Sequence, residues 1–250
     1  MRVFVTGGTG FLGYNTILHL LNLGHIVYVL VRKEQNILSD INNKSLFLVK
    51  GTLEDLEITD LPTIDVCVHF AWGGVNREGV NNLQIQHQNL NNSINLIDFL
   101  KKHHCRILID AGSRQEYAPT TDIITEKSPC IPVSEYGKWK LEAYQQTLLK
   151  VKDNMKYVHL RIFSIYGYGD HPWSLINTCI DKSMEGESIS FGQCRHFWSF
   201  LYIQDFVEAV SSVIEKMDSF EGSDVYNIAS GYIQPLKYFI NTIKSIVESD

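Results

Sequence analysis

Three side chains have the types and the order that proton transfer at a carbonyl or hydroxyl group requires. Ser113 follows a short apolar segment, and Tyr136 and Lys140 lie four residues apart at the start of an apolar helical pattern. This spacing places the tyrosine and the lysine on one helical face. Free tyrosine has a pKa of about 10, and a neighbouring ammonium favours the phenolate. We therefore expect Lys140 to lower the pKa of Tyr136, and Ser113 to hydrogen-bond the reacting oxygen.

A glycine motif near the N-terminus indicates which co-reactant this proton chemistry would accompany. Residues 3–5 are Val-Phe-Val, Gly7, Gly10 and Gly13 follow, and an apolar helical pattern then begins. Strand, glycine turn and helix in this order hold the pyrophosphate of a dinucleotide over the helix N-terminus. Residues 26–31 have the composition of a second strand, so the turn lies inside a βαβ unit. The motif therefore predicts a dinucleotide cradle.

The end of the second strand indicates which dinucleotide is preferred. Val31 stands where NAD-binding proteins of this kind usually have an acidic residue, and Arg32 and Lys33 follow it. Two cations suit the 2′-phosphate of NADP. A charge-assisted hydrogen bond is worth about 1.5–3 kcal/mol, so roughly ten- to a hundred-fold of preference is expected. The alternative is that the two cations only solubilise the strand end, with NAD as the cofactor.

Strands and helices alternate through the first two-thirds of the chain. Apolar strand segments are expected at 46–51, 65–71, 106–110 and 157–165, with helical patterns at 82–103 and 134–150. This order predicts the α/β class with a doubly wound parallel sheet. Ser113 then lies past the carboxyl end of a strand, the edge that faces the ligand crevice.

The pattern loosens from Tyr166, where we expect the chain to enter a separate lobe. Segments 200–203 and 225–229 are predicted to be strands that return to the sheet. The expected division is a dinucleotide-binding domain over 1–165 plus 200–230, and a small lobe over 166–199 and 231–250.

Composition excludes several classes of function. The chain has 250 residues, 44% of them hydrophobic, and a net charge of −6 with acids and bases interspersed. A nucleic-acid-binding surface would need clustered cations, and no apolar run approaches the roughly 20 residues of a membrane span. The chain leaves no room for a secretory signal before its first strand, and five scattered cysteines fit free thiols. We expect a cytoplasmic protein without a metal site.

The chain resembles the extended short-chain dehydrogenase/reductase family, in its branch of NAD(P)-dependent nucleotide-sugar epimerases, dehydratases and reductases. The landmarks are Thr6–Gly13, His69-Phe70-Ala71, Asn89, Gly112-Ser113 with Tyr117, Tyr136–Lys140, Leu160–Phe163, Tyr166-Gly167 and Leu201–Asp205. The resemblance covers nearly the whole chain. It implies a Rossmann sheet with a small C-terminal substrate-binding lobe.

The resemblance also implies roles for particular residues. Tyr136 would be the general acid or base, Lys140 would also bind the nicotinamide ribose, and Ser113 would polarise the reacting group. The positions that would contact the cofactor are Gly7, Gly10, Phe11, Leu12, Gly13, Thr52, Leu53, Ala71 and Asn89. The C-terminal lobe would bind a nucleoside diphosphate sugar, and helices 82–103 and 134–150 would form a homodimer interface.

Departures from the family pattern narrow the activity. Sugar 4,6-dehydratases carry Asp-Glu directly after the serine or threonine, whereas this chain has Arg114-Gln115. Glu116 comes one place late and would face the other side of an extended segment. A dehydratase is therefore disfavoured.

The substrate contacts are expected from residues near the strand ends and in the lobe. Ser164 replaces an asparagine that commonly touches the sugar diphosphate, and Arg195 could supply the missing contact. Trp72, His171 and Trp173 are further candidates, with aromatic core packing as the alternative for Trp72. Asp205 is expected to cap a helix that begins at Phe206.

These observations favour an NADPH-dependent reductase of a nucleotide-activated 4-keto-6-deoxy sugar. The enzymatic alternative is a nucleotide-sugar epimerase that holds NAD tightly. An alternative of another class is a non-catalytic NADP-binding regulator, which would not need the Ser113, Tyr136 and Lys140 set.

Overall fold

The computed structural model describes residues 1–33, 35–56, 61–152 and 155–247. They form two compact units. The first runs from Met1 to Ile162 and takes in Val207–Ile228; the second comprises Phe163–Phe206 and the chain from Ala229 on. Residues 163–165, 200–206 and 229–230, which the sequence pattern assigns to the dinucleotide-binding domain, belong to the second unit.

The first unit is a seven-stranded sheet in the order β10-β6-β5-β4-β1-β2-β3, in which all neighbouring strands run parallel. Its elements are β1 (Arg2–Thr6), α1 (Phe11–Asn22), β2 (Ile26–Val31), β3 (Leu46–Lys50), β4 (Val66–His69), α2 (Leu83–Lys102), β5 (Ile107–Ser113), the 3-10 turn η1 (Arg114–Glu116), α3 (Glu135–Val151), β6 (Lys156–Ile162), α5 (Ile203–Glu215) from Val207 on, the 3-10 turn η2 (Met217–Ser219) and β10 (Ser223–Ile228). The predicted α/β class and doubly wound parallel sheet are confirmed.

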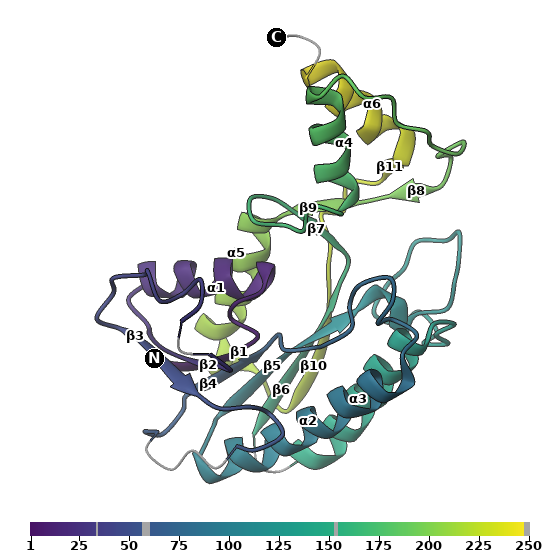
Figure 1. Cartoon of the computed structure of the whole chain (residues 1–250). Helices are drawn as coiled ribbons and strands as arrows, with labels where there is room; N and C mark the ends of the chain where they lie inside the picture. Colours follow the sequence, from purple (N-terminus) through teal and green to yellow (C-terminus); the bar gives the residue numbers. More distant parts are fainter. Residues whose placement is uncertain (34, 57–60, 153–154, 248–250) are drawn as a thin grey trace. The chain divides into compact units, whose positions relative to one another are not determined.

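Helices cover both faces of this sheet, with α1 and α5 on one side and α2 and α3 on the other (Figure 1). Every residue of β4 and β5 is buried, as a strand with both faces covered requires. The core between the sheet and α2 includes Phe4, Cys67, Leu96 and Tyr157. Full burial of such a side chain contributes roughly 1.5–3 kcal/mol, so this core fixes the strand ends that carry the site.

The second unit contains short strands and two helices. Its elements are β7 (Ser164–Tyr166), α4 (Leu175–Met184), β8 (Phe197–Trp198), β9 (Phe200–Tyr202), β11 (Gln234–Pro235) and α6 (Leu236–Val247). Strands β7 and β9 pair in parallel, β8 and β11 pair antiparallel, and α4 packs against α6.

The prediction that segment 200–203 returns to the main sheet is wrong. Strand β9 pairs with β7 instead, and Ser164 is aligned with Phe200. Alternating apolar residues identify a strand but do not specify its partner, so the sequence pattern could not separate the two pairings. The other predicted return is confirmed, because β10 pairs with β6.

The expected cap at Asp205 is also corrected. Helix α5 begins at Ile203, so Asp205 lies within its first turn and does not precede it. A carboxylate there still interacts favourably with the positive end of the helix dipole.

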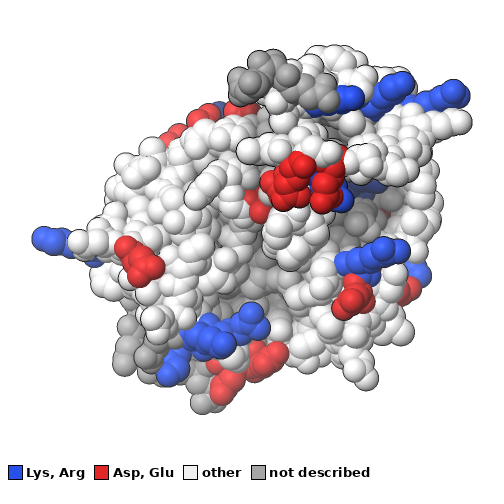
Figure 2. Space-filling view, turned by 45° about the horizontal axis from the view of Figure 1, so that its top comes forward, with Lys and Arg blue, Asp and Glu red and all other residues white. Residues whose placement is uncertain are grey.

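Charge is mixed on the molecular surface. On the face shown in Figure 2, Lys and Arg side chains alternate with Asp and Glu in small groups. Within the described ranges, none of the helices combines the length and apolarity needed to cross a membrane. In the same ranges no group of three or more His, Cys, Asp or Glu side chains could hold a metal ion.

Candidate active site

The turn between β1 and α1 is built around two glycines that the protein itself requires. Gly7 has a φ of +71°, and a Cβ there would lie 2.6 Å from the Ala71 nitrogen. A Cβ on Gly13 would lie 2.3 Å from the Gly7 carbonyl oxygen. Both contacts are with backbone, so neither position can accept a side chain unless the turn moves.

Gly10 differs from Gly7 and Gly13 because almost no protein atoms lie where its side chain would be. A Cβ there would have only the Gly7 carbonyl oxygen near it, at 3.4 Å. Gly10 is the N-cap of α1, no side chain of the described residues caps this helix, and its first turn carries no acidic residue. Phe11 and Leu12 follow in that turn, half-buried. Free N–H groups at an uncapped helix N-terminus attract anions, so this cradle fits a dinucleotide pyrophosphate.

The other predicted cofactor residues lie at the same edge of the sheet. Arg32 and Lys33 are exposed directly after β2, and Thr52 and Leu53 follow β3 closely. Strands β2 and β3 end side by side, because Val31 is aligned with Lys50. Ala71 follows β4, and its N–H donates to Thr6 Oγ1 over 3.3 Å. The fold thus gathers these residues along the carboxyl ends of β1 to β4.

The predicted catalytic residues come from the end of β5 and the start of α3. Ser113 is the last residue of β5 and is 8% exposed. Ser134 caps α3 by accepting a hydrogen bond from the Gly137 N–H at 3.0 Å. A Cβ on Gly137 would lie 2.2 Å from the Gln115 carbonyl oxygen. The glycine thus lets α3 approach the chain after β5, and Tyr136 hydrogen-bonds the Ser113 side chain.

Lys140 lies one turn further along α3 and is buried. Its Nζ donates to the Ala111 carbonyl oxygen at 2.6 Å and lies 3.8 Å from the centre of the Trp72 ring. Burial lowers the pKa of Lys140 to about 8, against the opposing charges of Asp110 and Glu116. The ammonium is 6.0 Å from the centre of the Tyr136 ring.

The expectation that Lys140 lowers the pKa of Tyr136 is not met in this structure. Burial raises the pKa of Tyr136 to about 12; the Ser113 hydrogen bond opposes this rise, and the charges of Glu116 and Asp110 add to it. Loss of solvation disfavours a phenolate, and Lys140 directs its proton to Ala111. Tyr136 is therefore a neutral phenol at physiological pH.

Two amides of α2 hold the loop after β4 against the site. Asn89 accepts from the Gly73 N–H at 2.8 Å and donates to the Gly73 carbonyl at 2.9 Å. Gln86 accepts from the Trp72 indole N–H at 2.8 Å. Trp72 in turn makes an edge contact with the Tyr136 ring at 6.3 Å. The Asn- and Gln-rich composition of residues 81–95 favours a solvated helix face, but Gln86 and Asn89 are buried.

A buried charge cluster lies beneath Ser113 and was missed by sequence reasoning. It consists of Asp110, Glu116, His159 and Arg161, each at most 8% exposed. Glu116 accepts from Arg161 Nε at 2.9 Å and lies 3.0 Å from His159 Nε2. His159 Nδ1 lies 3.2 Å from an Asp110 oxygen. The partners come from β6, so no local pattern signals the cluster.

The expectation that Glu116 lies on an extended segment is wrong. Residues 114–116 form a 3-10 turn, not an extended segment, and the Glu116 side chain points into the protein. Its carboxylate accepts from the Ser113 N–H at 2.6 Å. Both oxygens are therefore engaged with protein groups.

Four of the five predicted substrate contacts lie in the second unit. There the Ser164 hydroxyl accepts from the Trp198 indole at 2.9 Å. The His171 and Trp173 rings stack with centroids 4.5 Å apart, and Trp173 is 66% exposed. Arg195 is exposed. The fifth, Trp72, is half-buried in the first unit beside Tyr136.

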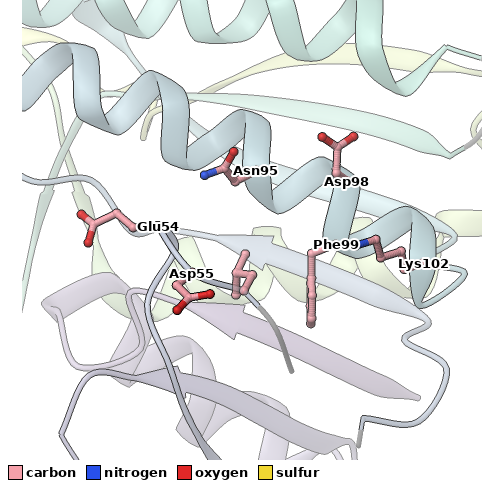
Figure 3. A pocket seen from close by; sticks show the side chains of 7 residues that line it. Glu54, Asp55, Asn95, Asp98, Phe99 and Lys102 are labelled. Atoms are coloured by element: carbon pink, nitrogen blue, oxygen red, sulfur yellow. The ribbon is translucent and has the colours of Figure 1, made fainter. Parts of the chain in front are cut away.

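A shallow pocket elsewhere on the first unit is separate from this site (Figure 3). It lies between α2 and the segment after β3 and is lined by Glu54, Asp55, Leu56, Asn95, Asp98, Phe99 and Lys102. Asp98 comes nine residues after Asn89 on α2, which is about 13 Å along a helix. None of the catalytic candidates lines it.

Fold and glycine cradle together define a dinucleotide-binding enzyme. The sequence model of the NAD dependent epimerase/dehydratase family matches residues 3–229. The chain belongs to this family, and it is an NAD(P)-dependent enzyme.

The individual proteins that this chain resembles share about a quarter of its residues or fewer. The chain is similar to a UDP-glucose 4-epimerase of Bacillus subtilis, 25% identical over 92% of this chain and 78% of that protein. It is similar to a CDP-abequose synthase of Yersinia pseudotuberculosis, 24% identical over 98% of this chain and 85% of that protein. A UDP-glucose 4-epimerase structure from Thermotoga maritima, with UDP-glucose, matches with a TM-score of 0.86 and 21% identity, covering 100% of this chain and 84% of that one.

The open space at Gly10 gives a first prediction. Alanine there adds a methyl where only the ligand would approach, so Gly10→Ala should weaken NADPH binding by roughly tenfold or more. Apo stability should fall only modestly, since alanine is a poorer N-cap than glycine. The measurement is the rise in melting temperature with NADPH concentration. Gly192→Ala, also in open space, is the control, and equal NADPH responses in both variants would contradict the assignment.

The charge cluster predicts a pH dependence of stability. Burial disfavours the charged form of His159, but Glu116 and Asp110 raise its pKa to about 8. A raised histidine pKa stabilises the fold below about pH 6.5, and this contribution is lost as pH rises through about 8. It amounts to on the order of 2 kcal/mol.

The corresponding variant is His159→Gln. Its deficit in the free energy of unfolding, measured by denaturant titration, should be largest below pH 6.5 and should shrink by pH 8.5. His87→Gln, which changes an exposed histidine of α2, serves as control. A deficit that stays constant over this range would show that His159 is not charged in the folded protein.

Proposed function

We propose that this protein is an NADPH-dependent reductase of a nucleotide-activated 4-keto-6-deoxy sugar. The proposal is supported by a complete proton-transfer set on the first unit and by cations at the end of β2. A CDP-sugar synthase and a UDP-sugar epimerase among its relatives support a nucleoside diphosphate sugar as substrate.

Each catalytic residue has a role that follows from its surroundings. The bound cofactor would supply a hydride to the sugar carbonyl carbon. Tyr136, held as a neutral phenol, would give its proton to the carbonyl oxygen. Ser113 would donate a hydrogen bond to the same oxygen as negative charge develops there. Lys140, anchored to Ala111, would keep α3 in place and present its ammonium to the cofactor ribose.

The observation that carries the choice of NADPH is the pair of exposed cations directly after β2. Val31 stands where an acidic residue would bind the ribose hydroxyls of NAD, and Arg32 and Lys33 follow it directly. Guanidinium and ammonium groups bind phosphate by charge-assisted hydrogen bonds. A cofactor that arrives reduced and leaves oxidised suits a reductase, whereas an epimerase recycles a cofactor that stays bound.

A nucleotide-sugar 4-epimerase with bound NAD is the second candidate. Several relatives, the Bacillus subtilis and Thermotoga maritima proteins included, are UDP-glucose 4-epimerases. A dehydratase is not proposed, because Arg114 and Gln115 take the places of its acid pair. Glu116 is committed to Ser113, His159 and Arg161.

The substrate would be held mainly by the second unit. We propose that Arg195 binds the diphosphate, and that Ser164 and the stacked His171–Trp173 pair contact the remainder of the nucleotide sugar, with Trp72 near the reacting carbon. We further propose a cytoplasmic homodimer formed through α2 and α3.

One incubation separates the two candidates. With NADPH and a set of 4-keto-6-deoxy sugar nucleotides of different bases, a reductase consumes one NADPH for each sugar reduced. An epimerase interconverts UDP-sugars without net loss of reduced cofactor. Absorbance at the nicotinamide band and chromatography of the sugar nucleotides give both readouts.

Removal of the phenol oxygen tests the role of Tyr136. Tyr136→Phe should lower kcat by roughly 100- to 10,000-fold, the usual contribution of a positioned acid. NADPH binding, followed by the shift in melting temperature, should be retained. Tyr14→Phe, a half-buried tyrosine of α1, is the control. Turnover by Tyr136→Phe close to that of the unmodified protein would exclude this residue as the acid.

Removal of the β2 cations tests cofactor choice. The double variant Arg32→Ala/Lys33→Ala should lose roughly ten- to a hundred-fold of its preference for NADPH over NADH, from the charge-assisted hydrogen bonds removed. The measurement is the ratio of kcat/KM for the two cofactors. Lys44→Ala, an exposed lysine before β3, is the control. An unchanged ratio would assign the two cations to solvation of the strand end.

A further inference from the structure

Both the side chain and the backbone N–H of Ser113 are hydrogen-bonded to the turn that follows it. Its side-chain oxygen accepts from the Gln115 N–H at 3.1 Å. Its own N–H donates to a Glu116 oxygen at 2.6 Å. This reciprocal arrangement is a capping box, but here it is buried: Ser113 is 8% exposed and Glu116 is 0% exposed. The carboxylate therefore fixes the backbone of the residue that faces the reacting oxygen.

Glu116 is itself held by two groups from β6. Arg161 Nε donates to it at 2.9 Å, and His159 Nε2 lies 3.0 Å away. The other nitrogen of His159 faces Asp110 at 3.2 Å. A carboxylate only accepts hydrogen bonds, so His159 donates to both of them in its imidazolium form, and Glu116 and Asp110 raise the pKa of His159 to about 8. Two carboxylates are then balanced by one imidazolium and one guanidinium.

Further groups face His159 from the elements packed around it. Tyr157, on the same strand, has its hydroxyl 3.1 Å from His159 Nδ1. Tyr144, from α3, has its ring 4.5 Å from the imidazole. Asp110 and Glu116 belong to β5 and η1, and Arg161 to β6. The charges of this cluster thus face one another inside the protein.

The backbone of β5 leaves room for this cluster. A Cβ on Gly112 would lie 2.3 Å from His159 Nε2 and 2.6 Å from Glu116 Oε1. The glycine that precedes Ser113 therefore makes space for the carboxylate and imidazole to meet. Burial of four charged groups gives little net stability compared with an apolar core of the same volume, so the arrangement calls for a reason other than stability.

We propose that Glu116 is a positioning residue for the reaction: held by His159 and Arg161, it fixes the Ser113 backbone so that the Ser113 hydroxyl points to the reacting oxygen. The inference rests on the proposed function through the role of Ser113. Glu116 does not touch the reacting atoms. Its contribution is to limit the orientations of Ser113. This matters because a small misplacement at the reacting centre lowers the rate strongly.

Glu116→Gln tests this, since it keeps the shape of the side chain and removes its charge. We expect kcat to fall roughly ten- to a hundred-fold, by analogy with loss of a preorganised donor, with both KM values within about twofold. The pKa of His159, followed by NMR of its imidazole, should also fall, because His159 loses one of its two carboxylates.

Tyr157→Phe is the matched control. It removes a buried hydroxyl that bonds Asp110 and approaches His159, and it lowers stability. The hydroxyl is not bonded to Ser113 or Glu116, so the kcat of this variant should stay within about twofold. If Glu116→Gln keeps the kcat of the unmodified protein, or if Tyr157→Phe loses as much turnover at equal loss of melting temperature, Glu116 is only structural.

An NMR measurement without substrate separates this inference from the proposed function. The Ser113 amide proton, bound to a carboxylate, should resonate far downfield and should move upfield in Glu116→Gln. If the unmodified protein neither reduces nor epimerises nucleotide sugars, the proposed function fails, and this resonance alone decides whether Glu116 holds Ser113. A Ser113 amide that does not move overturns the positioning.

Discussion

The site depends on the hydrogen bond between the Lys140 ammonium and the Ala111 carbonyl. This 2.6 Å contact joins α3 to β5, the two elements that carry Tyr136 and Ser113. Tyr136 precedes Lys140 by one helical turn, and Ser113 follows Ala111 by two residues, so this bond helps to hold the phenol near the hydroxyl. The Trp72 ring covers the ammonium at 3.8 Å. In these buried surroundings the hydrogen bond from Lys140 to the Ala111 carbonyl is stronger than the same bond would be in water.

A buried ammonium needs negative charge nearby, which Asp110 of β5 and Glu116 of η1 supply. Those carboxylates need partners in turn, which explains why His69 and His159 differ although both align with Asp110 across the sheet. His159 lies between two carboxylates and is charged. His69 lies between the Thr6 and Ser93 hydroxyls, at 2.6 and 3.1 Å, and burial lowers its pKa to about 4. Both histidines are buried, so the neighbouring groups decide which of the two is charged.

Local sequence signals predicted the elements and the order of the site. The glycine turn, the run of parallel strands and the Tyr136–Lys140 spacing each depend on residues within a few positions of one another. The interactions that were missed join distant segments. Glu116 meets His159 across 43 residues, Gln86 is buried by the loop after β4, and β9 pairs with β7 rather than with the main sheet. The pKa of Tyr136 was misjudged for the same reason, because burial by Trp72 and neighbouring elements outweighs a lysine whose proton is directed elsewhere.

The protonation state of Tyr136 bears on the direction of the reaction. A phenol with a pKa of about 12 carries its proton at neutral pH and can donate it at once to a carbonyl that receives a hydride. Oxidation of a hydroxyl, the first half of a 4-epimerase cycle, needs the phenolate instead. Each pKa unit above the ambient pH disfavours that form by about 1.4 kcal/mol, and this penalty already includes the charges of Glu116 and Asp110. The resting phenol therefore holds its proton at neutral pH, which is the protonation state from which Tyr136 would act as an acid toward a carbonyl oxygen.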